Sequence, residues 1–303
     1  MKTKRFLYPC SFLLAGVLLY GCGDDTDPEA DFDEGQEQDG PVELAIVKGE
    51  HGPMFDDISF EIISPAPDEV VKGDSITVHV KLQSNEFVLR APTQGEGANN
   101  LAYSKDGQHI HLIIDNEPYM AKYDTTFSIG GLTPGAHTLR AFPSRSWHES
   151  IKKPGSFVAH TFYVGQKNGE PALKADQPLL TYSRPKGEYV GQDAGEIMLD
   201  FYISSCVLAP DAYKVITSID EKVIDTLRDW TPYKIQGLEE GEHTIRLQLI
   251  DPNGNPVVNG DFNDTERTIT VKKKADTQKE AQKKEEDDLE KDLYDAGRHS
   301  SGL

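Results

Sequence analysis

One segment of this chain occurs twice without a gap, and this repeat constrains the fold more than any other feature. The first copy, 127–140, reads Phe-Ser-Ile-Gly-Gly-Leu-Thr-Pro-Gly-Ala-His-Thr-Leu-Arg, and the second, 233–246, reads Tyr-Lys-Ile-Gln-Gly-Leu-Glu-Glu-Gly-Glu-His-Thr-Ile-Arg. The offset between the two histidines is 243 − 137 = 106 residues. Alternating apolar residues around a glycine-bearing turn indicate two strands joined by a tight connection. A period of about a hundred residues matches one immunoglobulin-like sandwich and is too long for a solenoid.

The repeat therefore predicts an all-β chain with two tandem immunoglobulin-like or fibronectin-III-like β-sandwiches. A length of 303 residues leaves room for two such domains and for tails. The tail is rich in Lys, Glu, Asp and Gln, which is typical of an exposed charged helix or a frayed coil. The predicted boundaries are 1–21 for a signal peptide, 22–53 for an acidic disordered tether, 54–165 for the first sandwich, 166–180 for a linker, 181–272 for the second sandwich and 273–303 for the tail.

The N-terminus has the pattern of an export signal. Lys2, Lys4 and Arg5 form a basic region, and the apolar run 6–19 that follows is short for a membrane span. It ends in Leu-Tyr-Gly-Cys22, which resembles the lipobox of bacterial lipoproteins. The resemblance implies that Cys22 is acylated and anchors the protein to a membrane. An ordinary cleavable signal and an anchor helix are the alternatives.

The residues after Cys22 are strongly acidic. This run, Gly-Asp-Asp-Thr-Asp-Pro-Glu-Ala-Asp-Phe-Asp-Glu, resembles the surface-export signal of Bacteroidetes lipoproteins. The resemblance implies an outer-membrane lipoprotein exposed at the cell surface, with a periplasm-facing lipoprotein or a plain solvated spacer as alternatives. The net charge of −20 argues against nucleic acid as a partner, because phosphate binding needs clustered Lys and Arg.

Cysteine content limits the covalent chemistry of the folded part. Cys10 lies in the signal core and Cys22 is the predicted lipidation site, which leaves Cys206 as the one thiol of the folded part. A single thiol cannot form an internal disulfide. Cys206 lies in a segment that reads as a strand, so we interpret it as a packing residue.

The internal repeat acts as a control for function, because features present in both copies are expected to be structural. His137 and His243 occupy the same place, two residues after Gly135 and Gly241. We interpret both histidines as corner residues that tie a strand to the preceding turn. Features present in one copy are candidates for function.

Two features of the first copy have no counterpart in the second. They are the pair His109 and His111 and the loop 143–152, Pro-Ser-Arg-Ser-Trp-His-Glu-Ser-Ile-Lys. In a sandwich of the usual wiring, the strand that begins at His109 is the third and the strand that ends at Phe142 is the sixth. These strands are antiparallel neighbours, so the loops 83–108 and 143–156 are predicted to meet at one end.

Two chemistries suit this end of the first sandwich. In the first, Trp147 is an exposed stacking anchor, and Arg145, His148 and Glu149 are polar contacts to a glycan or protein ligand. In the second, His109 and His111, about 7 Å apart on one strand face, bind Zn or Cu with His148 or Glu149 from the loop as a further ligand. The plain alternatives are a solvated strand face and a tryptophan that pins its own loop to the core.

Motifs of catalysis are missing from the sequence. It contains no nucleophile elbow, HExxH motif, P-loop or dinucleotide-binding glycine loop. Asp251, Asn253 and Asn255 imitate half of a calcium loop but fit a hairpin turn better. The sequence thus favours a non-enzymatic binding or scaffolding role without a cofactor. A Cu or Zn site is the runner-up, and an enzyme ranks third.

Three segments also resemble a known group of proteins. They are 107–119, Gly-Gln-His-Ile-His-Leu-Ile-Ile-Asp-Asn-Glu-Pro-Tyr, 132–150, which ends in Pro-Ser-Arg-Ser-Trp-His-Glu-Ser, and 230–238, Trp-Thr-Pro-Tyr-Lys-Ile-Gln-Gly-Leu. They are similar to segments of an uncharacterised group of exported bacterial proteins and lipoproteins, common in Bacteroidetes and cyanobacteria. The resemblance implies kinship and marks the loop 143–150 as a signature, but it implies no activity.

Overall fold

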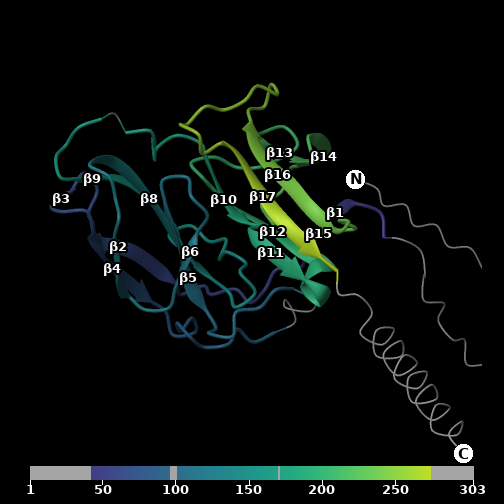
Figure 1. Ribbon diagram of the computed structural model, residues 1–303, viewed down its shortest axis with the longest axis horizontal. Coiled ribbons are helices and arrows are strands. Elements are labelled where there is room, and N and C mark those ends of the chain that lie inside the picture. Colours follow the sequence, from purple (N-terminus) through teal and green to yellow (C-terminus); the bar gives the residue numbers. More distant parts are fainter. Residues whose placement is uncertain (1–41, 96–100, 170, 274–303) are drawn as a thin grey trace, which may run out of the picture. The chain divides into compact units, whose positions relative to one another are not determined.

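The computed structural model describes residues 42–95, 101–169 and 171–273. The predicted signal peptide, Cys22, most of the predicted tether and nearly all of the predicted tail lie outside the described residues. Within them the chain is all-β, apart from one 3-10 turn, η1 (Gly191–Ala194). Figure 1 shows two groups of strands, the first in blue and teal and the second in green and yellow.

The first sandwich contains two sheets. Its strands are β2 (Ser59–Ser64), β3 (Val70–Val71), β4 (Ile76–Gln83), β5 (His109–Ile114), β6 (Met120–Lys122), β7 (Thr126–Ile129), β8 (Gly135–Ser144) and β9 (Val158–Val164). One sheet has the order β2-β4-β7 and the other has the order β3-β9-β8-β5-β6. Alternation in β4 buries Ile76, Val78 and Val80 against the opposite sheet and leaves His79 exposed.

The second sandwich repeats this wiring. Its strands are β10 (Leu179–Arg184), β11 (Gly187–Val190), β12 (Glu196–Ser204), β13 (Lys214–Ile219), β14 (Lys222–Leu227), β15 (Tyr233–Gln236), β16 (Gly241–Ile250) and β17 (Asp264–Lys272). The sheet orders are β15-β12-β10 and β11-β17-β16-β13-β14, which match the first sandwich strand for strand. The prediction of two tandem sandwiches of one topology is confirmed.

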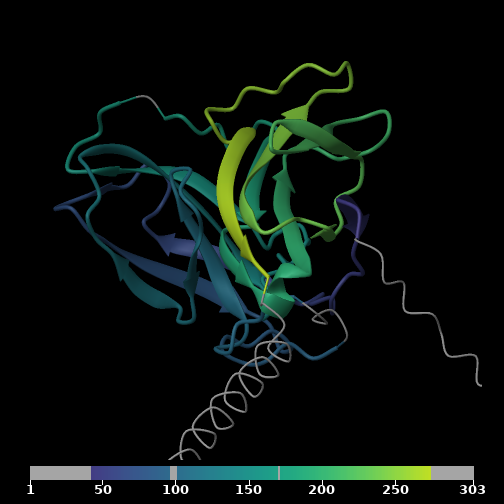
Figure 2. The ribbon, with the colours of Figure 1, turned by 45° about the vertical axis from the view of Figure 1, so that its right-hand side comes forward.

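The predicted end of the disordered tether is wrong. Within the expected tether 22–53, β1 (Ala45–Lys48) pairs with β15 and extends a sheet of the second sandwich. β1, drawn in purple, lies beside the green strands in Figure 1 and Figure 2. Ile46 packs against the second core, and the backbone of β1 covers the open edge of β15. The strand β1 is hard to predict from the sequence, because β1 is short and follows a long acidic run.

The predicted linker 166–180 also contains packed structure. Leu173 is buried in a cluster with Leu179 and Phe262, and Asn259 holds the segment through its side-chain amide, which accepts from the backbone N–H of Lys174. β10 begins at Leu179, within the expected linker. The second sandwich therefore begins earlier in the chain than its alternating pattern indicates.

β5 is buried on both of its faces, and this sets it apart from β4. Ile110, Leu112 and Ile114 face the core of the first sandwich. The other face carries Ile113, which joins a cluster with Tyr202 of β12. A strand face expected to meet solvent therefore lies against the second sandwich.

Candidate metal centre

The third histidine of the candidate site comes from the loop after β8. β5 pairs with β8 in the register His109↔Ser144 and His111↔Phe142, so the loop that follows β8 begins beside His109. This loop turns tightly: the N–H of His148 donates to the carbonyl of Arg145 at 2.9 Å, and His148 has a positive φ of 67°. The turn directs the His148 ring toward the β5 histidines. The predicted convergence of the two segments is confirmed.

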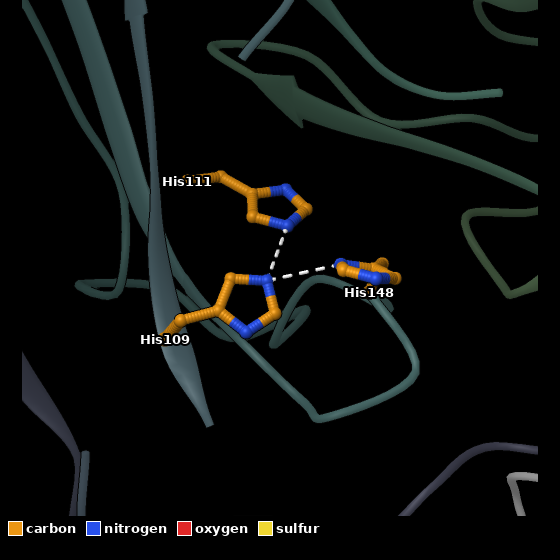
Figure 3. Close-up of side chains that lie close together, drawn as sticks. All are labelled: His109, His111 and His148. Carbon is orange, nitrogen blue, oxygen red and sulfur yellow. Dashed lines mark hydrogen bonds between the residues drawn. The ribbon is translucent and has the colours of Figure 1, made fainter. Parts of the chain in front are cut away.

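The three imidazoles point their nitrogens at one another. His109 Nε2 lies 3.0 Å from His111 Nε2 and 3.1 Å from His148 Nδ1 (Figure 3). One nitrogen from each ring lies within 4.8 Å of the other two. Three ligands at metal–nitrogen distances near 2.05 Å in a tetrahedral site stand about 3.3 Å apart. Two of the three nitrogen pairs, at 3.0 and 3.1 Å, are close to this spacing, and the third pair lies within 4.8 Å.

The outward nitrogens of the two β5 histidines are engaged. Nδ1 of His109 donates to the carbonyl oxygen of Gly107 at 2.8 Å, which leaves the lone pair of Nε2 directed at the centre. Nδ1 of His111 lies 2.9 Å from the hydroxyl of Ser183 on β10. Partners of this kind fix the ring orientation of histidine ligands in metal sites. The second sandwich thus supplies a support for a ligand of the first.

Burial keeps all three imidazoles neutral at physiological pH. It lowers the pKa of His109 to about 4, although the hydrogen bond to Gly107 acts in the opposite direction. Burial also holds the pKa of His111 and of His148 well below the ordinary value, and the positive charges of Arg184 and Lys186 lower them further. Neutral imidazole is the form that binds metal ions. The ligand atoms are therefore available without the loss of a proton.

Tyr119 forms one wall of the site. Its ring stacks on His111 with centroids 3.5 Å apart and an interplanar angle of 10°, and its hydroxyl lies 3.1 Å from His148 Nδ1. Burial raises the pKa of this phenol, so the hydroxyl keeps its proton. The ring of Tyr123 lies on another side, 5.2 Å from His109. Aromatic walls restrict the space around the centre to small ligands.

The expectation that Trp147 is exposed is wrong. Trp147 has no exposed surface, and Arg145 and Glu149 are each 1% exposed. The indole N–H of Trp147 donates to Glu149 Oε2 at 2.7 Å, and Arg145 Nη1 lies 3.0 Å from Glu149 Oε1. Arg145 also donates to the carbonyl of Pro53 at 2.6 Å. None of the three can stack on or contact an external ligand, because their surfaces are used to hold the loop that carries His148.

Sequence reasoning missed four residues at this site. They are Tyr119, Ser183, Arg184 and Lys186, which surround the three histidines. Tyr119 is the last residue of the segment 107–119, directly before β6, and a single tyrosine at that place gives little indication of a site. The other three come from β10 and the residues after it, and their position depends on how the two sandwiches pack. Nothing in the order of residues reveals that packing.

The two repeated histidines are structural, as predicted. His137 lies 2.9 Å from Asp115 Oδ2 and donates through Nε2 to the carbonyl of Thr133. His243 lies 2.7 Å from Asp220 Oδ2 and donates through Nε2 to the carbonyl of Glu239. Both tie the start of a strand to the preceding corner.

A separate hollow of about 380 Å³ lies beside the other tryptophan. Phe157 stacks on Tyr202 at 4.5 Å, and the ring of Trp230 meets Tyr202 edge-on at 4.6 Å. Cys206 lines the same hollow, and burial raises the pKa of its thiol to about 11, which suits an inert packing residue.

The segment 251–256 forms the predicted turn, since Asp251 accepts from the N–H groups of Asn253 and Asn255. Among the described residues, no helix has the length and apolar character that a membrane crossing requires.

Comparisons with known proteins carry no argument about this chain, so the fold assignment depends on its own strands and sheets. No family model matches the sequence, and no curated protein does. The fibronectin(III)-like modules of Clostridium thermocellum CbhA are 16% identical, with 71% of this chain and 94% of that chain covered and a TM-score of 0.24. The Bacteroides ovatus protein SGBP-B, solved with a mixed-linkage heptasaccharide, is 14% identical, with 70% and 47% covered and a TM-score of 0.20. At such TM-scores neither likeness supports a conclusion about function.

Proposed function

We propose that this protein is a metal-binding module in which the first sandwich supplies three imidazole ligands and the second sandwich covers them. The observation that carries the proposal is the convergence of His109 Nε2, His111 Nε2 and His148 Nδ1 at 3.0 and 3.1 Å in a buried place. Zn²⁺ and Cu²⁺ both suit imidazole ligands. Three protein ligands leave one position open for an exogenous ligand.

A network of hydrogen bonds without metal accounts for the geometry less well. His109 has one lone pair in the plane of its ring, because Nδ1 donates to Gly107, and two nitrogens approach that lone pair. If the Tyr119 hydroxyl donates to His148 Nδ1, the lone pairs of His148 and His109 face each other at 3.1 Å. A cation between the nitrogens removes this repulsion. Metal binding therefore satisfies all three rings together.

Metal analysis of the purified protein tests the proposal. We expect about one equivalent of Zn²⁺ or Cu²⁺ per chain, and loss of at least a hundredfold in affinity in His111→Ala. His79→Ala is the matched control, because His79 is an exposed histidine on β4 whose ring forms a hydrogen bond with Thr126. Equal metal content in the protein and in a His109→Ala, His111→Ala double variant would overturn the proposal.

Export places this site outside the cytoplasm. The predicted signal and lipidated Cys22 lie outside the described residues, so membrane anchoring and surface exposure remain proposals that depend on the sequence. Under them, the protein presents its metal site at the surface of the outer membrane or in the periplasm. Mass spectrometry of the mature N-terminus would test the anchor: we expect a diacylated or triacylated cysteine, and an unmodified N-terminus would contradict it.

The hollow beside Trp230 favours ligand binding as a second candidate function. Its wall is aromatic, and the buried hydroxyl of Ser204, which lines it, has no hydrogen-bond partner among the residues that the structure describes. Carboxylate and amide side chains, which sugars need, do not line the hollow. A flat, largely apolar molecule with one polar group fits it better than a glycan. Titration with 1-naphthol is expected to change Trp230 fluorescence and to fail in Val207→Trp, where an exposed valine at the rim becomes a ring that fills the space. An unchanged response in that variant would contradict ligand binding in the hollow.

A further inference from the structure

The charged side chains next to the three histidines are cations. Arg184 and Lys186 both act on all three rings, and among the described residues neither takes part in an ion pair with a carboxylate. Arg184 is 8% exposed, and its Nε has no hydrogen-bond partner. Buried positive charge without a negative partner is costly. Among the described residues, no negative charge next to the site therefore balances Arg184 and Lys186.

Both cations lie against Tyr119, and the ring of Tyr119 lies against the site. Lys186 Nζ lies 4.0 Å from the centroid of the Tyr119 ring and donates to the Tyr119 carbonyl at 2.7 Å. The guanidinium carbon of Arg184 lies 5.4 Å from the same centroid. The ring itself stacks on His111. One aromatic side chain thus contacts a proposed ligand of the metal and both uncompensated cations.

A divalent ion on three neutral imidazoles increases this imbalance of charge. Its two positive charges join those of Arg184 and Lys186, in a buried place where charges are weakly screened. Zinc and copper sites with three histidines keep a fourth position for an exogenous ligand. An anion in that position reduces the net charge and attracts both cations. A neutral water molecule there would not.

The hydroxyl of Tyr119 is positioned to bind such an anion. At present it lies 3.1 Å from His148 Nδ1, the nitrogen that faces His109. A metal that takes this lone pair removes the acceptor for the phenolic hydrogen, and a buried hydroxyl then needs another acceptor. An anion on the metal would supply one at short range.

We propose that the metal carries a small monovalent anion as its fourth ligand, that the Tyr119 hydroxyl donates to this anion, and that Arg184 and Lys186 attract it. This inference rests on the proposed metal site. The aromatic rings of Tyr119 and Tyr123 around the centre limit the anion to a few heavy atoms, such as azide, formate or hydroxide. His148 is the partly exposed member of the three histidines, so the anion enters on its side.

The experiment uses the purified protein loaded with Co²⁺, whose visible spectrum reports a change of ligand. We expect azide and formate to alter this spectrum in a saturable way. Tyr119→Phe keeps the stacked ring and removes the hydroxyl, and it is expected to weaken azide binding about five- to tenfold with little change in Co²⁺ affinity. Lys186→Gln is expected to weaken it by a similar factor.

Matched controls separate these effects from general damage. Tyr233→Phe removes a hydroxyl that donates to the carbonyl of Asp229, on a ring in the core of the second sandwich, and is expected to leave azide affinity unchanged. Lys167→Gln removes an exposed lysine that pairs with Asp68 and is expected to leave it unchanged as well. Azide affinity that is equally weak in Tyr119→Phe and Tyr233→Phe would overturn the role of the hydroxyl. A Co²⁺ spectrum that ignores both anions would overturn the anion site alone, whereas failure to bind Co²⁺ would overturn the metal site with it.

Discussion

The third strands of the two sandwiches have the same neighbours but different surroundings. β5 is buried at each of its six positions, whereas β13 has Lys214 and Ile216 partly exposed. Relative to Asp115 and Asp220, which start the equivalent corners, Lys214 and Ile216 stand where His109 and His111 stand in the first sandwich. The strand position alone does not make a site. It becomes one where a second domain covers the outer face and lowers the pKa of the imidazoles.

The largest difference is expected between the two tryptophans. Trp147→Ala removes a fully buried ring and leaves the Glu149 carboxylate without its indole donor, so we expect a loss of about 4–5 kcal/mol in unfolding free energy. Trp230→Ala removes a partly exposed ring at the edge of a hollow and should cost about 1–2 kcal/mol. Chemical denaturation measures both. Equal losses would contradict the assignment of Trp147 as the core of the loop.

A buried and an exposed arginine–carboxylate pair provide the next contrast. Glu149→Gln leaves Arg145 buried without a counter-charge and should cost about 3 kcal/mol. Asp264→Asn breaks the pair of Asp264 with Arg246 in the second sandwich, where both side chains are about two-fifths exposed, and should cost less than about 1 kcal/mol. Denaturant titration of the two variants measures the two losses of unfolding free energy. A cost at Glu149 as small as that at Asp264 would show that solvent reaches the loop.

Acid should act on the two kinds of histidine in opposite directions. The pKa of His109 is about 4 in the folded protein and near 6.5 in the unfolded chain, so the unfolded chain binds more protons between these values. In metal-free protein, His109 should therefore cost roughly 3 kcal/mol of stability as the pH falls from 6.5 to 4. The pKa of His243 is raised, so His243 contributes stability below pH 6.5 and loses it as the pH rises through its folded pKa.

A pair of variants separates these contributions. His109→Gln should flatten the decline in stability between pH 6.5 and 4, whereas His243→Gln should remove a loss of stability that occurs as the pH rises above 6.5. The free energy of unfolding, measured in the presence of a chelator at several pH values, gives both slopes. A decline that is unchanged in His109→Gln would mean that the His109 ring is solvated in the folded protein.

The sequence was sufficient for the fold and for half of the site. The repeat around His137 and His243 predicted two sandwiches, and the antiparallel pairing of β5 with β8 followed from that topology. It therefore predicted that His109, His111 and His148 converge. Their burial and the donor role of Ser183 depend on the packing of one sandwich against the other, for which alternation along a strand carries no signal. This missing signal for packing also explains why Trp147 was expected to be exposed to solvent.

The smallest difference between the two sandwiches is expected at the repeated corners, where the two copies agree. His137→Ala and His243→Ala each remove a hydrogen bond to a carbonyl and one to an aspartate. We expect a loss of about 2 kcal/mol for His137, which is 6% exposed, and about 1 kcal/mol for the more exposed His243. Metal content should be unchanged in both variants, because neither residue lies near the three histidines of the site. Loss of metal in His137→Ala, with the fold retained, would show that the corner and the site are coupled and that the repeat does not separate structure from function.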